Sequence, residues 1–552
     1  MRHLPIRFAA AFTALLATGF VGAQTHEPAR DPLARYQECI ARLAFRYHTI
    51  GRQRLATLRD DKALQQLAAD YQKPQAEAEY ARYTIASMLG RSFDSAPFVE
   101  PLNTLRLGQQ KPADAWLWVQ ALRVLTDHNG ELDVQGVAAE AKQAWQRAAA
   151  IAAIGSSKRG NVTAAIKPAC AAFPKKDGER MLLLGAMTFA LWETRARVND
   201  AEYREALTAY IGLLDPKVGL SKLGKVQMAR TLQAILKAPA AFEDPASWLQ
   251  VLARGDVKKT TSQTSAAPSF FGIGGDGERF CYVIDLSDSM GKKVPKEHKG
   301  PITGERKKPK NAVLDESDLP WHKIDTRWDL AREQLRISLS RLSPDQWFCI
   351  VWFGSEAGTL AATKGLVKAT RANIDKAMGE LDNIKLGEAD PVIAPDGRLR
   401  GRTNLHGGLR RAFAVHSGGL SMDAAYVDEK ALADGCDTVF LLSDGAPSAD
   451  DFQINDRDYG EEQVVVDVEY GAAAARSPRL DYYGPYILDE WIVEDARRMN
   501  TFRRIRIHCI GLGEANLSLL RSLAGVGGGE TFVVGQQRAP ANAGGGGGGL
   551  KK

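Results

Sequence analysis

Four uninterrupted apolar segments in the second half of the chain limit its fold more than any other feature. They are Phe280–Leu286, Trp347–Phe353, Thr438–Leu442 and Ile505–Leu512, each of strand length, with amphipathic helical segments between some of them. A strand that is apolar on both faces is typical of a parallel sheet covered by helices on both sides. The sequence therefore predicts a doubly wound, mostly parallel α/β domain over residues 278–537.

The first half of the chain, residues 24–255, is predicted to be all helix. It is rich in Ala, Leu, Arg, Glu and Gln, with apolar residues at helical spacing. Breakers such as Asp215-Pro216 divide it into helices of ordinary length, which suits stacked helical hairpins, although no clean repeat period is found. Residues 256–277 are rich in Lys, Thr, Ser, Ala and Gly, and are predicted to form a flexible linker between two domains.

The two ends of the chain are predicted to lie outside both domains. Arg2 and Arg7 precede an acid-free apolar stretch that ends in small residues, the pattern of a secretory signal over residues 1–23. The mature protein is therefore expected to be secreted or periplasmic. An uncleaved anchor is the alternative, but the stretch is shorter than the roughly 20 residues that a spanning helix needs. The Gly-rich residues 538–552 are predicted to be a disordered tail.

Charge and cysteine content exclude two classes of protein. The net charge of +6, from 72 basic and 66 acidic residues, is too small an excess to make the whole chain a nucleic-acid binder. Six cysteines are too few to form the framework of a chain this long, and Cys281, Cys349 and Cys509 lie in apolar strands, where we expect them to pack. Cys39 and Cys170 are candidates for a disulfide in an oxidising compartment, a pairing that spacing alone does not decide.

Oxygen-bearing side chains follow two of the predicted strands. Asp285, Ser287 and Ser289 alternate where the first strand opens into a loop, Asp444 follows the third strand, and Thr403 lies in another loop. If the strands that end at Asp285 and Asp444 are neighbours at the topological switch point, their carboxyl ends form a ligand-binding crevice. Short oxygen ligands on one turn would supply part of the six-oxygen shell of Mg²⁺. A turn capped by hydrogen-bonding side chains is the alternative.

These residues resemble the metal-ion-dependent adhesion site of the von Willebrand factor A domain family. Asp285, Ser287 and Ser289 match its Asp-x-Ser-x-Ser motif, Thr403 its loop threonine, and Asp444 the aspartate after its fourth strand. The resemblance covers nearly half of the chain. It implies that Ser287, Ser289 and Thr403 contact Mg²⁺ directly or through water, with Mn²⁺ or Ca²⁺ as alternatives, while the two carboxylates act largely through water. The ion would then accept an Asp or Glu from a protein partner.

Two charged insertions depart from the compactness of that family. Residues 292–324 follow the metal loop and are strongly basic, and residues 449–485 follow the last ligand and are strongly acidic. Both are predicted to project from the metal-bearing face, where they would pair with each other or frame a partner; two solvated loops without a role are the alternative. We expect the basic insertion to steer an acidic partner towards the metal. Its candidate contacts are Lys292, Lys293, Lys296, Lys307 and Lys308.

The sequence as a whole predicts an exported protein-binding or adhesion protein and not an enzyme. No general base is identifiable beside the metal loop, and the chain has no nucleophile-elbow or phosphate-loop motif. His406, close to Thr403 in sequence, is expected to begin a helix or to pack rather than to bind the ion. The alternative is that the helical half is an enzyme or a scaffold, and that the second domain only recruits substrate or stabilises an assembly.

Overall fold

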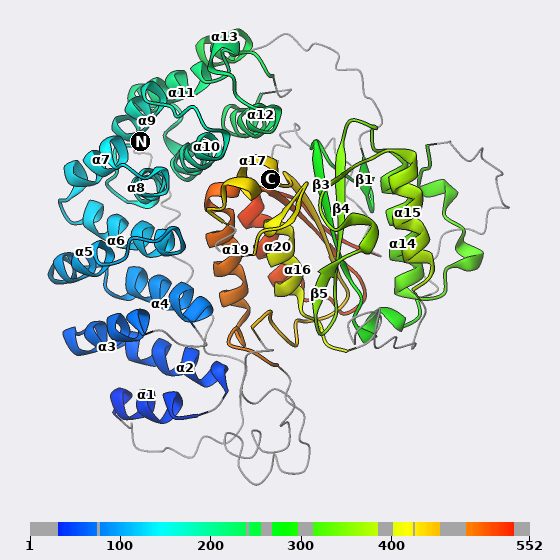
Figure 1. The fold of residues 1–552 in the computed structure, drawn as a ribbon, viewed down its shortest axis with the longest axis horizontal. Helices are drawn as coiled ribbons and strands as arrows, with labels where there is room; N and C mark the ends of the chain where they lie inside the picture. Colours follow the sequence, from blue (N-terminus) through cyan, green and yellow to red (C-terminus); the bar gives the residue numbers. More distant parts are fainter. Residues whose placement is uncertain are drawn as a thin grey trace, which may run out of the picture.

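The fold is described from a computed structural model (Figure 1). The structure describes residues 31–42, 44–73, 78–238, 242–254, 268–295, 313–384, 401–422, 426–452 and 482–534. The predicted signal peptide, the Gly-rich tail and most of both charged insertions lie outside these residues. Within the described part of the chain, no helix has both the length and the apolar character needed to cross a membrane.

The described residues up to Arg254 fold into helices, as the composition and the apolar spacing predict. Short 3-10 turns connect several of them. The α-helices are α1 (Pro32–Ile40), α2 (Phe45–Ala56), α3 (Asp61–Gln72), α4 (Ala78–Ser92), α5 (Val99–Leu107), α6 (Ala115–Asp127), α7 (Glu131–Glu140), α8 (Ala144–Ser156), α9 (Val162–Ala171), α10 (Asp177–Glu193), α11 (Ala201–Gly212), α12 (Lys222–Leu236) and α13 (Pro245–Arg254).

Polar side chains fix where several of these helices begin. The Asp60 carboxylate accepts the Ala63 N–H at 2.8 Å at the start of α3, and the Asn161 side chain accepts the Ala164 N–H at 3.1 Å at the start of α9. Each bond satisfies one of the backbone N–H groups that a helix start leaves without a partner, and contributes about 1 kcal/mol. Capping side chains of this kind recur in the first half of the chain, where they mark the starts of separate short helices.

The helices stack in two layers that form an arc around the rest of the molecule (Figure 1). The even-numbered helices α2 to α12 line the inner side of this arc, and successive members of the inner layer are neighbours. The odd-numbered helices α3 to α13 lie on the outer side. This is the stacking of helical hairpins that the spacing of the breakers predicts, and it leaves the inner layer facing the second domain.

The chain is ordered in part of the segment predicted to be a flexible linker, residues 256–277. Within it β1 (Ser269–Phe270) pairs antiparallel with β2 (Ile273–Gly274). The apolar side chains of this hairpin are buried in the core of the α/β domain. The prediction of flexibility is therefore wrong for the end of the segment, because its aromatic and aliphatic residues have a core to enter. Residues 255–267 lie outside the described residues.

The α/β domain contains the predicted parallel sheet. The order of its strands is β11-β10-β9-β3-β4-β5, and β6 also pairs with β4. The chain passes from β3 to β4 on one side and later returns to β9 on the other side of β3, so the boundary between β3 and β9 is a topological switch point. The parallel strands are β3 (Arg279–Asp285), β4 (Trp347–Phe353), β9 (Thr438–Ser443), β10 (Arg506–Gly511) and β11 (Thr531–Val533), and the antiparallel additions are β5 (Ala357–Thr359) and β6 (Val367–Lys368).

Helices cover both faces of this sheet (Figure 1). One face is covered by α14 (Arg327–Ser340) and α15 (Arg371–Asp382), and Thr326 begins α14 through a capping box. The opposite face packs against α16 (Leu405–Ala414), α19 (Asp489–Arg503) and α20 (Leu517–Gly527). The fold class is therefore confirmed: a doubly wound α/β domain preceded by an all-helical region.

The inner helices of the arc pack against α19 and its neighbours, which themselves cover one face of the sheet. Gly185 of α10 lies directly against the backbone of Phe502 in α19, where a Cβ would overlap the Phe502 carbonyl. The hydroxyl of buried Tyr426 accepts the Trp116 N–H of α6 at 3.1 Å and donates to the Ala113 carbonyl at 3.0 Å. One continuous hydrophobic core runs from the inner helices into this face of the sheet. The two predicted regions are thus joined by a shared interior.

No disulfide is present among the described residues. All six cysteines are free thiols, including the candidate pair Cys39 in α1 and Cys170 in α9. The strand cysteines Cys281, Cys349 and Cys509 are fully buried, as expected for packing residues. Packing rather than covalent cross-linking therefore holds the arc together.

Candidate metal centre

Two buried carboxylates lie at the carboxyl ends of neighbouring parallel strands. Asp285 is the last residue of β3 and Asp444 directly follows β9, in a register that pairs Ile284 with Leu442. Both aspartates are 0% exposed. The predicted site required the strands that end at Asp285 and Asp444 to be neighbours, and they are. The crevice at their carboxyl ends is the usual ligand position of a doubly wound sheet.

The loop after β3 brings three further polar groups to the same place. The Ser287 N–H donates to Asp285 Oδ1 at 2.9 Å, and the hydroxyls of Ser287 and Ser289 lie 3.0 Å apart. The Ser289 hydroxyl donates to Asp444 Oδ1 at 2.6 Å. Ser289 lies in a short 3-10 turn, which lets its side chain reach Asp444 only a few residues after the end of β3. Four of the five predicted ligands are therefore linked by hydrogen bonds.

Thr403, the fifth predicted residue, comes from a separate loop that is tied to the first. The Gly401 N–H donates to Asp288 Oδ1 at 2.8 Å, and the Asp288 N–H donates back to the Gly401 carbonyl at 3.2 Å. A Cβ placed on Gly445 would lie 3.7 Å from the Ser289 hydroxyl and 3.9 Å from the Thr403 hydroxyl. The two hydroxyls thus border the same small space beside Gly445.

Arg327 completes this cluster and was not identified from the sequence. Its Nη1 donates to Asp444 Oδ2 at 2.7 Å, and its side chain is 9% exposed. Gly513, at a φ of +52°, makes room for the guanidinium, which any side chain at that position would overlap. A cation in the first turn of a helix is poorly placed relative to the helix dipole. The arginine at the first position of α14 is therefore a sequence signal from which a local role could have been inferred.

Every carboxylate oxygen of the centre already has a donor from the chain. The Ser443 hydroxyl donates to Asp285 Oδ2 at 2.8 Å, and the other three oxygens are held by Ser287, Ser289 and Arg327. Hydroxyls, in contrast, keep lone pairs that are free to accept a cation. The arrangement favours direct contact through hydroxyls and contact through water for the carboxylates.

The charges in the centre are not balanced. Burial, together with the negative charge of Asp444, raises the pKa of Asp285 to about 7. The cluster of Asp285, Asp444 and Arg327 contains two carboxylates and one guanidinium, which pairs with Asp444, so its net charge is −1 when both carboxylates are ionised. Buried charge of this kind is costly unless a counter-charge is supplied. A cation in the space beside Gly445 would supply it.

The donor set fits a hard divalent cation. Mg²⁺ prefers oxygen ligands and usually keeps several waters, so three protein hydroxyls with water-bridged carboxylates form a reasonable shell. In the ranges that the structure describes, no three His, Cys, Asp or Glu side chains form a group that would hold a metal. Binding here would therefore depend on the hydroxyls of Ser287, Ser289 and Thr403.

The charged insertions match their prediction only in part. The Lys292 ammonium lies 2.8 Å from a carboxylate oxygen of Glu514 and is exposed. At the start of the acidic insertion, Asp450 is buried and the side chain of Asp451 is only 7% exposed, so neither projects into solvent. The prediction that the acidic insertion projects from the metal-bearing face is wrong for these two residues, because each has polar partners inside the domain. Lys293 is described and exposed, whereas the remaining candidates lie outside the described residues: Lys296, Lys307 and Lys308.

A second group of buried charges, the interface cluster, lies between α16, α19 and the inner helices. It consists of His406, Arg410, Asp451, Asp495 and Arg498. His406 Nε2 lies 2.8 Å from Asp495 Oδ2, Arg498 Nε donates to Asp495 Oδ1 at 2.7 Å, and Arg410 pairs with Asp451. Although burial alone would raise it, the Arg498 charge holds the pKa of Asp495 well below its usual range. His406 is therefore a packing residue of α16, as expected.

Comparison with known proteins gives structural similarity alone. No model of a protein family matches the chain, and no curated protein matches it. Similar solved structures include a von Willebrand factor type A protein from Catenulispora acidiphila, at 13% identity and a TM-score of 0.25, with 49% of this chain and 40% of that chain covered. The PilB minor pilin from Streptococcus sanguinis is 16% identical, with a TM-score of 0.25 and coverage of 47% and 57%. Less than two thirds of each of those chains is matched.

Proposed function

We propose that this chain is an exported protein-binding protein whose α/β domain holds a divalent cation and uses it to bind an acidic side chain of a protein partner. Mg²⁺ is the expected ion, with Mn²⁺ or Ca²⁺ as alternatives. The proposal rests on one observation, the convergence at the switch point of five side chains: Asp285, Ser287, Ser289, Thr403 and Asp444.

The charge balance supports an acidic ligand. The two carboxylates and Arg327 carry a net charge of −1, so a divalent ion would change the centre to +1. Three neutral hydroxyls do little to reduce the charge of the ion. A carboxylate that enters the coordination shell from outside would restore neutrality, and at short range in a partly buried site this attraction is strong.

We propose that the helical half acts as a scaffold rather than as an enzyme. Its inner layer packs on α19 through Gly185 and is joined to the α/β domain by a continuous core. The carboxyl edge of the sheet is thereby presented in one fixed orientation relative to the outer helices. A partner that contacts both the ion and the outer layer would bind without the cost of ordering two mobile domains.

The metal is tested first, by titrating the chelator-treated full chain with Mg²⁺, Mn²⁺ and Ca²⁺ in a calorimeter. Thr403→Val removes one hydroxyl with little change in shape, and we expect it to weaken binding at least tenfold. Thr208→Val, an exposed change on α11, is the matched control and should bind as wild type. Absence of a binding heat and of a melting shift for all three ions with the wild type would overturn the metal centre.

The partner is tested by capture from a native periplasmic or extracellular extract. Mature wild type and an Asp285→Ala/Ser287→Ala variant, each confirmed to be folded, are compared in Mg²⁺ and in EDTA. We expect one partner to be retained only by the wild type with Mg²⁺, and to be lost when its carboxylates are amidated. A partner retained equally in all four conditions would place binding on the helices or the charged loops.

A further inference from the structure

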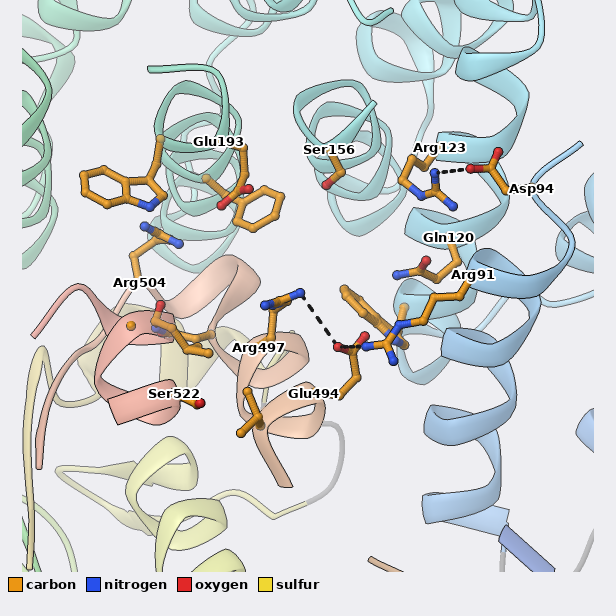
Figure 2. A pocket seen from close by; sticks show the side chains of 17 residues that line it. Arg91, Asp94, Gln120, Arg123, Ser156, Glu193, Glu494, Arg497, Arg504 and Ser522 are labelled. Atoms are coloured by element: carbon orange, nitrogen blue, oxygen red, sulfur yellow. Dashed lines mark hydrogen bonds and ion pairs between the residues drawn. The ribbon is translucent and has the colours of Figure 1, made fainter. Parts of the chain in front are cut away.

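A cavity of about 780 Å³ lies at the junction of the two halves, and none of its lining residues belongs to the metal centre (Figure 2). One wall comes from α4, α6, α8 and α10 of the inner layer, and the other from α19 and α20. Small-molecule sites commonly have volumes of roughly 300–1,000 Å³ and often lie where two domains meet. The cavity therefore has the size and the position of a ligand site.

Four arginines line this cavity, and two of them are already neutralised. Arg91 pairs with Glu494, and Arg123 lies 3.2 Å from Asp94 and 3.1 Å from Asp127. These pairs use two of the three acidic side chains of the wall. The third acid is Glu193.

Arg497 and Arg504 are the arginines with the least compensation. The nearest ion-pair contact of Arg497 is 3.9 Å long and goes to Glu494, which Arg91 already holds. Arg504 forms no ion pair with the described residues, and its Nε is buried without a hydrogen-bond partner there. Burial lowers the pKa of Arg504 to about 10, against the more distant charge of Glu193.

The two side chains lie on one wall. Arg497 lies in the last turns of α19, and Arg504 is the residue that ends this helix. Figure 2 shows Arg497 and Arg504 extending from the α19 wall of the cavity, with Arg504 reaching toward the inner helices. Both cations line the same cavity, and arginine is well suited to bind the oxygens of a carboxylate or phosphate group.

The backbone gives a second reason to assign a role to Arg504. The residue ends α19 in the left-handed conformation, at φ 51° and ψ 37°. Glycine is the usual residue at such a helix end, and a side chain there costs about 1–2 kcal/mol. Among the described residues, no ion pair accounts for an arginine at this position. Strain of this kind is commonly found where a side chain serves a ligand.

We infer that this cavity binds a small organic anion whose carboxylate or phosphate group is held by Arg497 and Arg504. Aromatic side chains supply the surface for its apolar body, and Arg504 Cζ lies 5.8 Å from the centroid of the Phe189 ring. Trp116 and Trp192 line the same space. Because the walls come from both halves, a bound anion bridges them and stabilises the folded chain.

The test uses the full chain with phenyl phosphate, benzoate and the neutral analogue benzyl alcohol, by calorimetry and thermal shift. We expect at least one anion to bind and to raise the melting temperature, and benzyl alcohol to do neither. Arg504→Met should weaken that binding at least tenfold, and Arg497→Met, a change of a partly exposed residue, provides a second variant if the first fails to fold. Arg521→Met on the exposed side of α20 is the matched control and should bind as wild type.

The two anions distinguish the head group, since binding of only one of them identifies it as phosphate or carboxylate. Binding that weakens as salt increases is also expected, because the contact is between charges. The inference is overturned if neither anion binds the wild type at concentrations up to about 10 mM. It is equally overturned if benzyl alcohol binds as well as the anions do, or if both arginine variants bind as wild type.

Discussion

Two groups of buried carboxylates in the same α/β domain are balanced in opposite ways. In the interface cluster Asp495 has Arg498 and His406 within hydrogen-bonding distance, and its pKa is lowered. At the candidate metal centre Arg327 pairs with Asp444, and burial beside the like charge of Asp444 raises the pKa of Asp285 to about 7. The interface cluster has its counter-charges within the protein and stabilises the fold. The candidate metal centre lacks one counter-charge, which we propose that a bound cation supplies.

Asp495→Asn should produce the largest loss of stability. It leaves Arg498 buried with its main counter-charge removed, which typically costs about 3–5 kcal/mol. We expect that decrease in the free energy of unfolding measured in urea at neutral pH. Asp200→Asn, which removes an exposed partner of Arg197, should change it by less than about 0.5 kcal/mol. A decrease of similar size in the two variants would show that the interface cluster is not a structural device.

Acid should weaken the interface cluster. The folded pKa of Asp495 lies below its unfolded value, so the stabilisation is complete above the unfolded pKa of about 4 and is lost as the pH falls below it. We expect the stability of the wild type to fall more steeply than that of Asp495→Asn between pH 5 and pH 3. Parallel curves for the two proteins would contradict the assignment.

Arg327→Met should give a loss that the metal repairs. Without the guanidinium, Asp444 loses a charged hydrogen bond, which costs about 1.5–3 kcal/mol in EDTA. Because the ion then supplies the missing charge, Mg²⁺ should restore most of this loss and should bind at least tenfold more tightly than to the wild type. Failure of Mg²⁺ to restore stability would place Arg327 with the structural arginines of the interface cluster.

Asp285→Asn should change stability in the opposite direction to Asp495→Asn. A neutral amide removes the like-charge repulsion with Asp444, and the Ser443 hydroxyl can turn to accept from it. We expect an increase of about 1 kcal/mol in EDTA, together with loss of the Mg²⁺-induced rise in melting temperature. A clear destabilisation in EDTA would mean that the wild-type centre is already satisfied without an ion.

Lys292→Ala should have the smallest effect on stability. Its pair with Glu514 is exposed, and exposed pairs contribute about 0–1 kcal/mol. The informative measurement is the rate of partner association at low salt, which should fall if the basic insertion steers the partner. An unchanged rate would remove Lys292 from the steering surface.

The parts of the molecule that local patterns define could be predicted from the sequence. Apolar segments gave the parallel strands, and the residues after two strand ends gave the side chains that the fold brings together. Arg327 and the packed hairpin before β3 were missed. Arg327 reaches Asp444 across 117 residues, and no local periodicity reports a contact of that kind.

The joining of the two halves was missed for the same reason. Gln53 of α2 donates to Glu490 at a separation of 437 residues, and Arg91 of α4 pairs with Glu494 across 403 residues. In a sequence, the polar residues of an amphipathic helix predict a face that is exposed to solvent. Only the three-dimensional arrangement shows that part of that face on the inner helices is an interface.

The close contact of Gly185 with Phe502 joins two segments that are synthesised at very different times. The inner helices leave the ribosome long before α19, and Gln227 must wait 276 residues for its partner Arg503. At about 5–20 residues per second, this delay lasts roughly 15–55 s. Throughout that time the arc has an apolar inner surface and nothing to cover it. The inner layer of the arc is therefore covered only after α19 and its neighbours have been made.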